Sequence, residues 1–346
     1  MNNIKYFDLF AGIGGFHQAI KELKINSLNF EHMGYCEIDK QARLFYEKVH
    51  EIKNSIVIEN ATDIKTKKTD GIELKPFDLL FAGFPCQSFS NVGYRKGLND
   101  ERGQLFYTIL NLLDYYKPKY FILENVQKIS TIKKGSLISE MKDALESISN
   151  GYHLHLWDLN AKNYGVPQNR RRMFFCGIRA DLFNKKELDI PPEIDLKTCK
   201  YPTTWHLLEK DNKDTRHIIP QKTRKTVLYK NEKWQGNVDI DNIIARPITA
   251  SMQKWHRANQ DNYFSEHYIN SSKPTLNNNI CLENDIIRRI TPLEGFRLQG
   301  FPDYFEDVAK QLNLSYSCQY RLIGNSVPVS MVKSVLNHFF ENYKEK

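Results

Sequence analysis

Residues 4–16 read IKYFDLFAGIGGF, and they say more about the class of fold than any other stretch. Residues 4–10 are mostly apolar, residues 11–15 are rich in glycine, and residues 17–23 follow a helical pattern. A strand, a glycine turn and a helix in this order open a nucleotide-binding α/β domain, where glycines let the backbone approach a ligand closely. The turn could equally be a tight connection, so the interpretation depends on the segments that follow.

Further short apolar runs predict further strands of the same domain. Residues 33–36 (MGYC) are followed by Glu37, an acidic residue about 20 positions after the glycines, where a carboxylate can accept hydrogen bonds from ribose hydroxyls. Asp63 follows at the expected end of a third unit and could hold an adenine amino group, or simply serve as a turn or cap residue. The pattern therefore favours a ligand that contains a ribose.

Residues 83–91 (GFPCQSFSN) place Cys86 behind Pro85 in a loop that follows the apolar run 77–82 (FDLLFA). A lone cysteine is most often buried and structural. A loop of Gly, Pro, Gln and Ser does not bury a thiol in an apolar core, however, and thiolate chemistry needs an exposed, polar environment. We interpret Cys86 as a candidate nucleophile at the carboxyl edge of the sheet.

Other reactive side chains adjoin the next predicted strands. Residues 120–123 (YFIL) end at Glu124, which the pattern places at the same edge as Cys86; a helix-cap role is the alternative. Arg170, Arg171 and Arg172 run into the apolar residues 173–178 (MFFCGI). Alternation along a strand predicts that Arg170 and Arg172 share one face, suited to an anionic or carbonyl-bearing substrate, and that Arg171 points to the other.

The ordered motifs of this chain resemble those of the DNA cytosine-5 methyltransferases, of the bacterial or phage restriction-modification type. The resemblance covers nearly the whole chain. It implies a Rossmann-like S-adenosylmethionine-dependent α/β domain with a mostly parallel sheet, plus a smaller irregular target-recognition domain. The matching stretches are 8–16 (DLFAGIGGF), 83–90 (GFPCQSFS), 124–126 (ENV), 168–172 (QNRRR), 289–303 (RITPLEGFRLQGFPD) and 324–327 (GNSV).

For the catalytic residues, the resemblance implies that Cys86 adds to C6 of a flipped-out cytosine. Glu124 would contact N3 and the amino edge of the base, and Arg170 and Arg172 would hold the base and the catalytic loop. A thiolate must add first because cytosine C5 is a poor nucleophile, and covalent catalysis splits one difficult step into easier ones. The residues expected to contact DNA around this site are Gln87, Ser90 and Gln168.

For the cofactor, the resemblance implies that Phe10 stacks on the adenine of S-adenosyl-L-methionine. Glu37 would bind the ribose and Asp63 the adenine. Many family members carry Trp where this chain has Ile38, so the adenine here lacks that aromatic neighbour. The remaining positions implied for the cofactor are Gly12, Gly14, Gly15, Ile38, Pro85, Leu105, Asn325 and Ser326.

Composition agrees with a DNA enzyme. The chain has 346 residues, of which 41% are hydrophobic, enough for one large core and a smaller domain, and its formal net charge is +8. It contains no apolar run near 18 residues and no signal-like start, so we expect a soluble, cytoplasmic monomer. Six scattered cysteines without a C-x-x-C pair disfavour zinc and disulfides, and we expect no metal requirement.

A second domain is predicted at residues 187–285, which leaves residues 1–186 and 286–346 as a discontinuous catalytic domain. Residues 197–235 carry ten Lys or Arg but four Asp or Glu. Such a surplus is often only a solvated face, but aromatic residues interleaved with basic ones favour DNA contact. The candidate base-reading stretch is 246–264 (RPITASMQKWHRANQDNYF), with Arg246, Gln253 and Arg257 as expected DNA contacts.

The sequence disfavours other functions. A tRNA methyltransferase of the same family would carry Cys-Phe-Thr between residues 187 and 285, and an amino-methylating DNA enzyme would need Asn- or Asp-Pro-Pro-aromatic; neither is present. A catalytically silent DNA-binding module or a nicotinamide dehydrogenase is disfavoured by Cys86, Glu124 and Arg172. The sequence identifies neither the DNA target nor a cognate endonuclease, which would act on the same site without contacting this protein.

Overall fold

Two units with separate cores make up the computed structural model. The first comprises Met1–Leu159, Arg171–Pro192 and Val332–Lys346, and the second comprises Asn160–Arg170 and Glu193–Met331. The residues that the structure describes are 2–25, 28–53, 55–84, 104–148, 151–230, 232, 235, 238–273 and 285–343.

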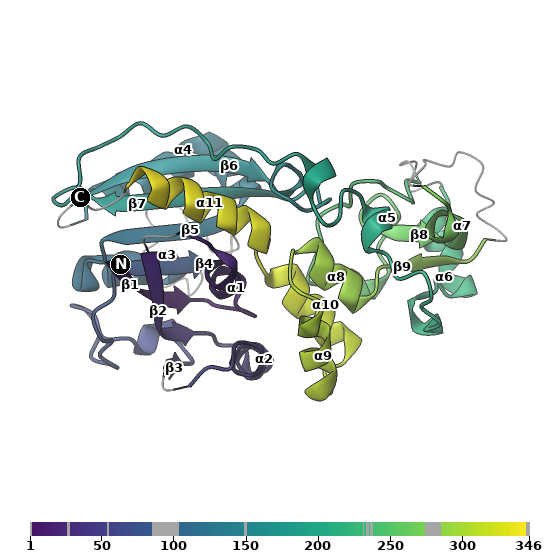
Figure 1. The fold of residues 1–346 in the computed structure, drawn as a ribbon, viewed down its shortest axis with the longest axis horizontal. Coiled ribbons are helices and arrows are strands. Elements are labelled where there is room, and N and C mark those ends of the chain that lie inside the picture. The colour runs from purple at the N-terminus through teal and green to yellow at the C-terminus, as the bar shows by residue number, and fades with distance from the viewer. Residues whose placement is uncertain are drawn as a thin grey trace. The chain divides into compact units, whose positions relative to one another are not determined.

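The first unit is built on a seven-stranded sheet with the strand order β3-β2-β1-β4-β5-β7-β6 (Figure 1). β1 pairs in parallel with β2 and β4, β2 with β3 and β4 with β5, whereas β5 and β7 are antiparallel. The prediction of an α/β fold with a mostly parallel sheet is confirmed. The strands are β1 (Asn2–Leu9), β2 (Leu28–Cys36), β3 (Ile56–Ile58), β4 (Leu79–Gly83), β5 (Tyr120–Val126), β6 (Tyr152–Asn160) and β7 (Arg171–Arg179).

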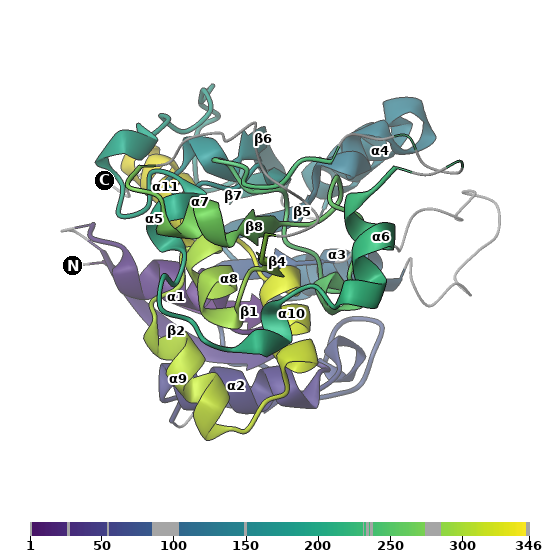
Figure 2. The same cartoon turned by 90° about the vertical axis from the view of Figure 1, so that its right-hand side faces the viewer.

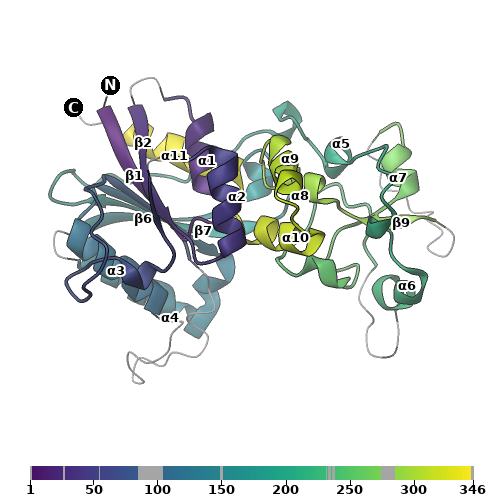
Figure 3. The same ribbon diagram turned by 90° about the horizontal axis from the view of Figure 1, so that it is seen from below.

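Helices cover both faces of this sheet, as buried parallel strands require (Figure 3). α1 (Gly15–Glu22), α2 (Lys40–His50) and α11 (Val329–Asn342), which enters this unit at Val332, lie on one face. α3 (Gln104–Tyr116) and α4 (Ser136–Glu146) lie on the other. Successive side chains of β1 point to opposite faces of the sheet, so this strand contacts both layers of helices. Phe7 and Leu9 join the core formed with α3 and α4, whereas Tyr6 and Asp8 bond to α1 and α2.

The strand order places a topological switch point between β1 and β4. From β1 the chain continues outward through β2 to β3, and β4 on the other side of β1 leads outward to β5. In open α/β sheets, ligands bind outside the carboxyl ends of the strands at such a point. Phe10 follows β1 there and Phe84 follows β4, so the glycine turn and the residue that precedes Pro85 both lie at this edge.

The second unit is irregular, with short helices and a two-stranded antiparallel sheet of β8 (Tyr263–Ser265) and β9 (Ile287–Arg289) (Figure 2). A capping box of Thr291 and Glu294 starts α8, and the Glu294 carboxylate also pairs with buried Arg288 at 2.6 Å. The helices are α5 (Thr204–Leu207), α6 (Gln221–Leu228), α7 (Glu266–Asn270), α8 (Pro292–Leu298), α9 (Tyr304–Gln311) and α10 (Tyr316–Asn325).

The second unit is larger than the predicted recognition domain. Residues 160–170 and 286–331 group with residues 193–285 by contact. β9 explains part of this, because it lies after residue 285 and pairs with β8 before it. The expectation that residues 187–285 carry target choice concerns function, and it stays a prediction.

Candidate active site

Glu37 is held at the carboxyl edge of β1 and β2 by backbone groups. Its Oε2 accepts a hydrogen bond from the Gly12 amide and its Oε1 accepts one from the Asp39 amide, both at 2.8 Å. The Arg43 guanidinium donates to the Glu37 carbonyl at 2.8 Å, which fixes the backbone as well. A carboxylate has about four acceptor sites, so these bonds from the backbone are compatible with further hydrogen bonds from ribose hydroxyls.

The glycine turn leaves room on its ligand side at Gly12. Gly12 has φ +56°, and a Cβ added there would meet no atom of the described residues within 4 Å. Gly14 differs, because a Cβ there would lie 2.1 Å from His50 Nε2. Gly12 therefore meets the requirement for close approach of a ligand, whereas Gly14 lets the turn pack on α2. Gly15 begins α1 and is buried, and Phe10 is partly buried with φ 58°.

The other first-unit residues expected at the cofactor lie near the same edge. Ile38 directly follows β2 and Glu37, and its side chain is 73% exposed. Asp63 is exposed in a 3-10 helix (Ala61–Asp63) that follows β3. Leu105 lies in the first turn of α3 and is partly buried. This placement is compatible with a bound adenosyl group. Contacts between these three side chains and such a group stay a prediction.

Three histidines lie under the glycine turn, on α1, β2 and α2. The ring centroids of His17 and His50 are 4.3 Å apart, and those of His17 and His32 are 4.8 Å apart. His50 Nε2 donates to the Ile13 carbonyl at 3.0 Å, which ties the turn to α2. Burial lowers the pKa of all three histidines, to about 4 for His32 and about 3 for His50. The cluster is therefore neutral at pH 7.

We expect this cluster to make the protein sensitive to acid. Below pH ~6.5 the unfolded chain binds protons on these histidines while the folded protein does not, so stability is lost as the pH falls toward their folded pKa values. Asp8 acts in the opposite sense, because burial raises its pKa. Burial also raises the pKa of Asp241 and Asp261 to about 6 and lowers the pKa of His155 and His217, so five histidines oppose three carboxylates, each contributing at most about 1.4 kcal/mol per pH unit.

The melting temperature, measured from pH 7.5 to pH ~4, is the readout. We predict a steep fall for the wild type and a shallower fall for His32→Gln, which lacks one titrating ring. His267→Gln removes an exposed histidine of α7 and should follow the wild type. Equal slopes for the wild type and His32→Gln would contradict the prediction.

Glu124 and Arg172 form a buried ion pair on β5 and β7. Arg172 Nε lies 2.6 Å from Glu124 Oε1, and the two residues are 9% and 7% exposed. Burial lowers the pKa of the Arg172 guanidinium while Glu124 raises it, and a guanidinium stays charged at physiological pH. The structure thus brings these two predicted residues together. Glu124 lies within β5 rather than after it, since the strand continues to Val126.

Asn125 is a residue whose importance the sequence reasoning missed. It is 1% exposed, and its Nδ2 donates to the Phe84 carbonyl at 2.9 Å. The Phe84 amide donates to the Glu124 carbonyl at 3.3 Å. Phe84 directly precedes Pro85, so the strand that carries Glu124 also fixes the chain just before Cys86. An amide following Glu124 in the 124–126 motif was the available signal.

Part of the predicted site lies outside the described residues. These positions are Pro85, Cys86, Gln87 and Ser90. Their expected roles stay predictions.

Gln168 and Arg170 lie in the interior of the second unit. Gln168 is 0% exposed and Arg170 is 3% exposed. The Arg170 guanidinium donates to the carbonyls of Ile248, Gly324 and Ser326, whereas Arg171 is exposed and pairs with Asp158 in the first unit. Burial thus alternates as predicted along 170–172. A DNA contact by Gln168 stays a prediction, and it would require the side chain to leave its interior hydrogen bonds.

The remaining predicted residues also lie in the second unit. Asn325 is exposed at the end of α10, and Ser326 is buried with its hydroxyl donating to the Ile323 carbonyl. Arg246 pairs with Asp239 at 2.9 Å. The Arg257 guanidinium donates to the Thr226 carbonyl at 3.2 Å, and Gln253 can donate to the Ala250 and Ser251 carbonyls. Any base reading by these three side chains must compete with these local bonds.

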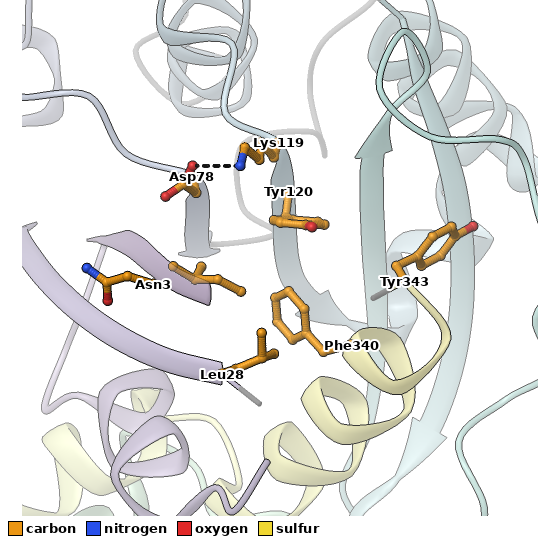
Figure 4. A pocket seen from close by; sticks show the side chains of 8 residues that line it. Asn3, Leu28, Asp78, Lys119, Tyr120, Phe340 and Tyr343 are labelled. Atoms are coloured by element: carbon orange, nitrogen blue, oxygen red, sulfur yellow. Dashed lines mark ion pairs between the residues drawn. The ribbon is translucent and has the colours of Figure 1, made fainter. Parts of the chain in front are cut away.

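Other features of the first unit lie away from this edge. A small pocket opens at the amino-terminal ends of the strands, where Asp78 and Lys119 lie 3.6 Å apart (Figure 4).

In the described ranges, no three His, Cys, Asp or Glu side chains are grouped to hold a metal ion. The helices in those same ranges are too short or too polar to cross a membrane.

Comparison with known proteins identifies the family. Residues 4–341 match the family model of the C-5 cytosine-specific DNA methylases. The chain is 30% identical to the type II methyltransferase M.Bsp6I of Bacillus sp. (strain RFL6), covering 96% of this chain and 98% of that protein. It is also 30% identical to the type II methyltransferase M.HpaII of Haemophilus parainfluenzae, covering 95% and 87%.

Solved structures agree at the level of the fold. The Entamoeba histolytica methyltransferase EhMeth matches with a TM-score of 0.72 and 21% identity over 100% of both chains. The S. pombe Dnmt2 methyltransferase matches with a TM-score of 0.72 and 22% identity over 99% of this chain and 100% of its own. The family and this fold imply a methyl donor of the S-adenosylmethionine type and a DNA substrate. The chain belongs to the C-5 cytosine-specific DNA methylase family and is a DNA (cytosine-5-)-methyltransferase.

Proposed function

We propose that this protein methylates C5 of one cytosine in a specific duplex DNA sequence through a covalent bond between Cys86 and C6 of the base. The observation that carries the proposal is the junction of β4 and β5. Glu124 of β5 pairs with Arg172 of β7, and the residue after Glu124, Asn125, donates a hydrogen bond to the carbonyl of Phe84, which follows β4. One strand edge thus positions both an acid or hydrogen-bonding group and the chain leading to the nucleophile.

Cys86 is our candidate nucleophile, and the four cysteines that the structure describes are poor alternatives. Burial raises the thiol pKa of the described cysteines, to about 12 for Cys36 and also upward for Cys176, Cys199 and Cys318. A thiolate, not a thiol, adds to carbon. These four cysteines are therefore poorly suited to nucleophilic addition. The polar sequence around Cys86 would favour its thiolate, and we propose that the cationic Arg172 lies close enough to add to this effect.

The residues of the chain have separate tasks in the reaction. Cys86 adds to C6, and electron density moves toward C5. Glu124 donates a proton or a hydrogen bond to N3, which stabilises the charge that develops on the ring, and Arg172 orients Glu124. After methylation, water takes the C5 proton, the C6–S bond breaks as the C5–C6 double bond re-forms, and N3 returns its proton to Glu124, so the Cys86 thiolate is regenerated. A base inside the duplex is inaccessible to these groups, so it must be flipped out at a cost of a few kcal/mol.

The cofactor is proposed to bind at the switch point of the sheet. The Glu37 carboxylate and the open side of Gly12 fit the ribose and nearby atoms of S-adenosyl-L-methionine. Phe10, Ile38 and Asp63 would contact the adenine, and the other positions would be Gly14, Gly15, Pro85, Leu105, Asn325 and Ser326. When bound, S-adenosylmethionine supplies an electrophilic methyl group on a sulfonium. Glu37 and the turn would orient it.

We further propose that the enzyme protects host DNA in a restriction-modification system and acts as a monomer in the cytoplasm. The type II relatives support this setting. A cognate endonuclease would share the DNA site without contacting this protein. Target choice would lie in residues 187–285, and base flipping would be coupled to reading the site.

The direct test is methyl transfer from labelled S-adenosylmethionine to DNA and to tRNA, with the product base identified by mass spectrometry. We expect 5-methylcytosine in DNA and full activity in EDTA, since the proposed chemistry uses thiol, carboxylate and guanidinium groups. Methylation at N4, a requirement for Mg²⁺, or transfer to tRNA but not to DNA would refute the proposal.

Target choice can be tested after bisulfite sequencing of DNA from cells that express the enzyme has revealed the methylated site. A good bidentate contact to a base discriminates by about 1–3 kcal/mol. We therefore predict that Arg257→Ala or Gln253→Ala relaxes the site by about 5- to 150-fold at one position, with 5-methylcytosine still the product. Unchanged specificity after exchange of residues 187–285 with those of a relative would contradict this assignment.

A further inference from the structure

Three buried side chains of the second unit form one hydrogen-bonded network. Gln168 and Gln299 are 0% exposed, and Arg170 is 3% exposed. Gln168 Nε2 donates to Gln299 Oε1 at 3.3 Å and to the Leu298 carbonyl at 2.8 Å. Gln299 Nε2 donates to the Ile323 carbonyl at 2.8 Å. Most of these bonds end on backbone atoms, so the network fixes chain segments.

The network joins the candidate base-reading stretch, residues 246–264, to residues 324–327, which include the candidate cofactor contacts Asn325 and Ser326. The Ile248 amide donates to Gln168 Oε1 at 3.0 Å, and the Ile248 carbonyl accepts from Arg170 Nη1 at 2.7 Å. Arg170 Nη2 donates to the carbonyls of Gly324 and Ser326 at 3.0 and 2.8 Å. Ile248 belongs to the 246–264 stretch, and Ser326 belongs to the 324–327 motif. One guanidinium therefore connects the two.

Gly324 provides independent evidence that the backbones of the two segments are in close contact. A Cβ added at Gly324 would lie 2.3 Å from the Ala250 nitrogen and 2.4 Å from the Thr249 carbonyl carbon. These are backbone atoms, which cannot move aside as the end of a flexible side chain could. The contact thus requires glycine. A shift of the 248–250 backbone must therefore displace Gly324 and the residues next to it.

Arginine suits this position because its planar fork presents several donors in fixed directions. Lysine would offer a point charge on a flexible stem and cannot reproduce the same fork geometry. Burying a cation is costly unless its donors are satisfied, so this geometry demands that both segments stay in place. Displacement of either one leaves Arg170 with unsatisfied donors.

We propose that Arg170 is a positioning residue that couples DNA recognition to cofactor binding. The inference rests on the proposed function, because it assumes that residues 246–264 read the DNA and that residues 324–327 contact the cofactor. When DNA fixes the first segment, Arg170 and Gly324 hold the second in its binding arrangement. By thermodynamic reciprocity, the cofactor must then tighten DNA binding by the same factor.

The test measures this coupling directly. The dissociation constant of S-adenosylhomocysteine is measured with and without a duplex oligonucleotide that carries the site found by bisulfite sequencing. The wild type should bind at least about 5-fold more tightly with the duplex, the low end of typical coupling. Arg170→Lys should bring this ratio close to one, whereas Arg171→Ala, an adjacent and exposed position, should keep it.

A general loss of stability would not produce this pattern, because the ratio compares one folded variant with itself. Gln168→Met, which removes the acceptor for the Ile248 amide, gives a second and milder variant if Arg170→Lys does not fold, and its ratio should fall as well. A wild-type ratio of one, or a wild-type ratio retained in a folded Arg170→Lys or Gln168→Met, overturns the coupling. The duplex can be designed only after the enzyme has methylated DNA, so absence of methyl transfer by the wild type refutes the proposed function, whereas a ratio of one in an active wild type refutes the coupling alone.

Discussion

Replacing Cys86 by alanine is expected to lower turnover by at least about 10⁴-fold, the scale seen when a catalytic nucleophile is removed. The reason is chemical, because without addition at C6 the C5 atom of cytosine does not become nucleophilic. Cofactor binding should change little, since Glu37 and Gly12 are held by their own hydrogen bond. The measurements are single-turnover methyl transfer and equilibrium binding of S-adenosylhomocysteine.

A matched control is Cys199→Ala, which removes a partly exposed thiol of the second unit. Burial raises the pKa of this thiol, so it is a poor nucleophile and the variant should keep wild-type turnover. If Cys86→Ala retains ordinary turnover, the assignment of the nucleophile is wrong.

The second large effect is expected for Glu124→Gln. General acid catalysis contributes about 10²- to 10⁴-fold, and glutamine can donate a hydrogen bond but cannot transfer a proton to N3. We therefore predict that kcat falls within this range while the KM for DNA changes much less. The amide also leaves Arg172 without its carboxylate, and breaking a buried pair costs up to about 3–5 kcal/mol. Thermal unfolding measured alongside kcat separates the two effects.

Asp158→Asn is the control for Glu124→Gln, because it makes the same chemical change in an ion pair of the neighbouring strands. Arg171, the partner of Asp158, is exposed, so this pair is worth at most about 1 kcal/mol. The variant should keep wild-type kcat and nearly wild-type stability. Equal losses of kcat in the two variants would remove the special role assigned to Glu124.

The sequence was sufficient for the parts of the fold that depend on local pattern. The apolar run and glycine turn of residues 4–16 predicted β1 and the start of α1, because strand period and glycine chemistry act over a few residues. The ordered motifs also identified the family. Glu124 and Arg172 are brought together across β5 and β7, and the signal was their placement at the ends of predicted strands, Glu124 after residues 120–123 and Arg172 before residues 173–178.

The roles that depend on distant partners could not be read from the sequence. Gly14 looks like Gly12 in the turn, and only the position of His50 on α2 shows that it is needed for packing. Gln168 and Arg170 read as a motif for substrate contact, yet their interior partners lie about 80 or more residues away in the chain. Such contacts leave no local periodicity, which is also why Asn125 was overlooked.

The covalent step is the central claim, and trapping it is the most direct test. A duplex with 5-fluorocytosine at the target position cannot lose its C5 substituent after methyl transfer, so the enzyme should remain attached. We predict an adduct that withstands denaturation, forms only with S-adenosylmethionine present, and maps to Cys86 by mass spectrometry of the digested protein. Absence of any adduct at Cys86, from enzyme that methylates the unmodified duplex, would contradict covalent catalysis by this residue.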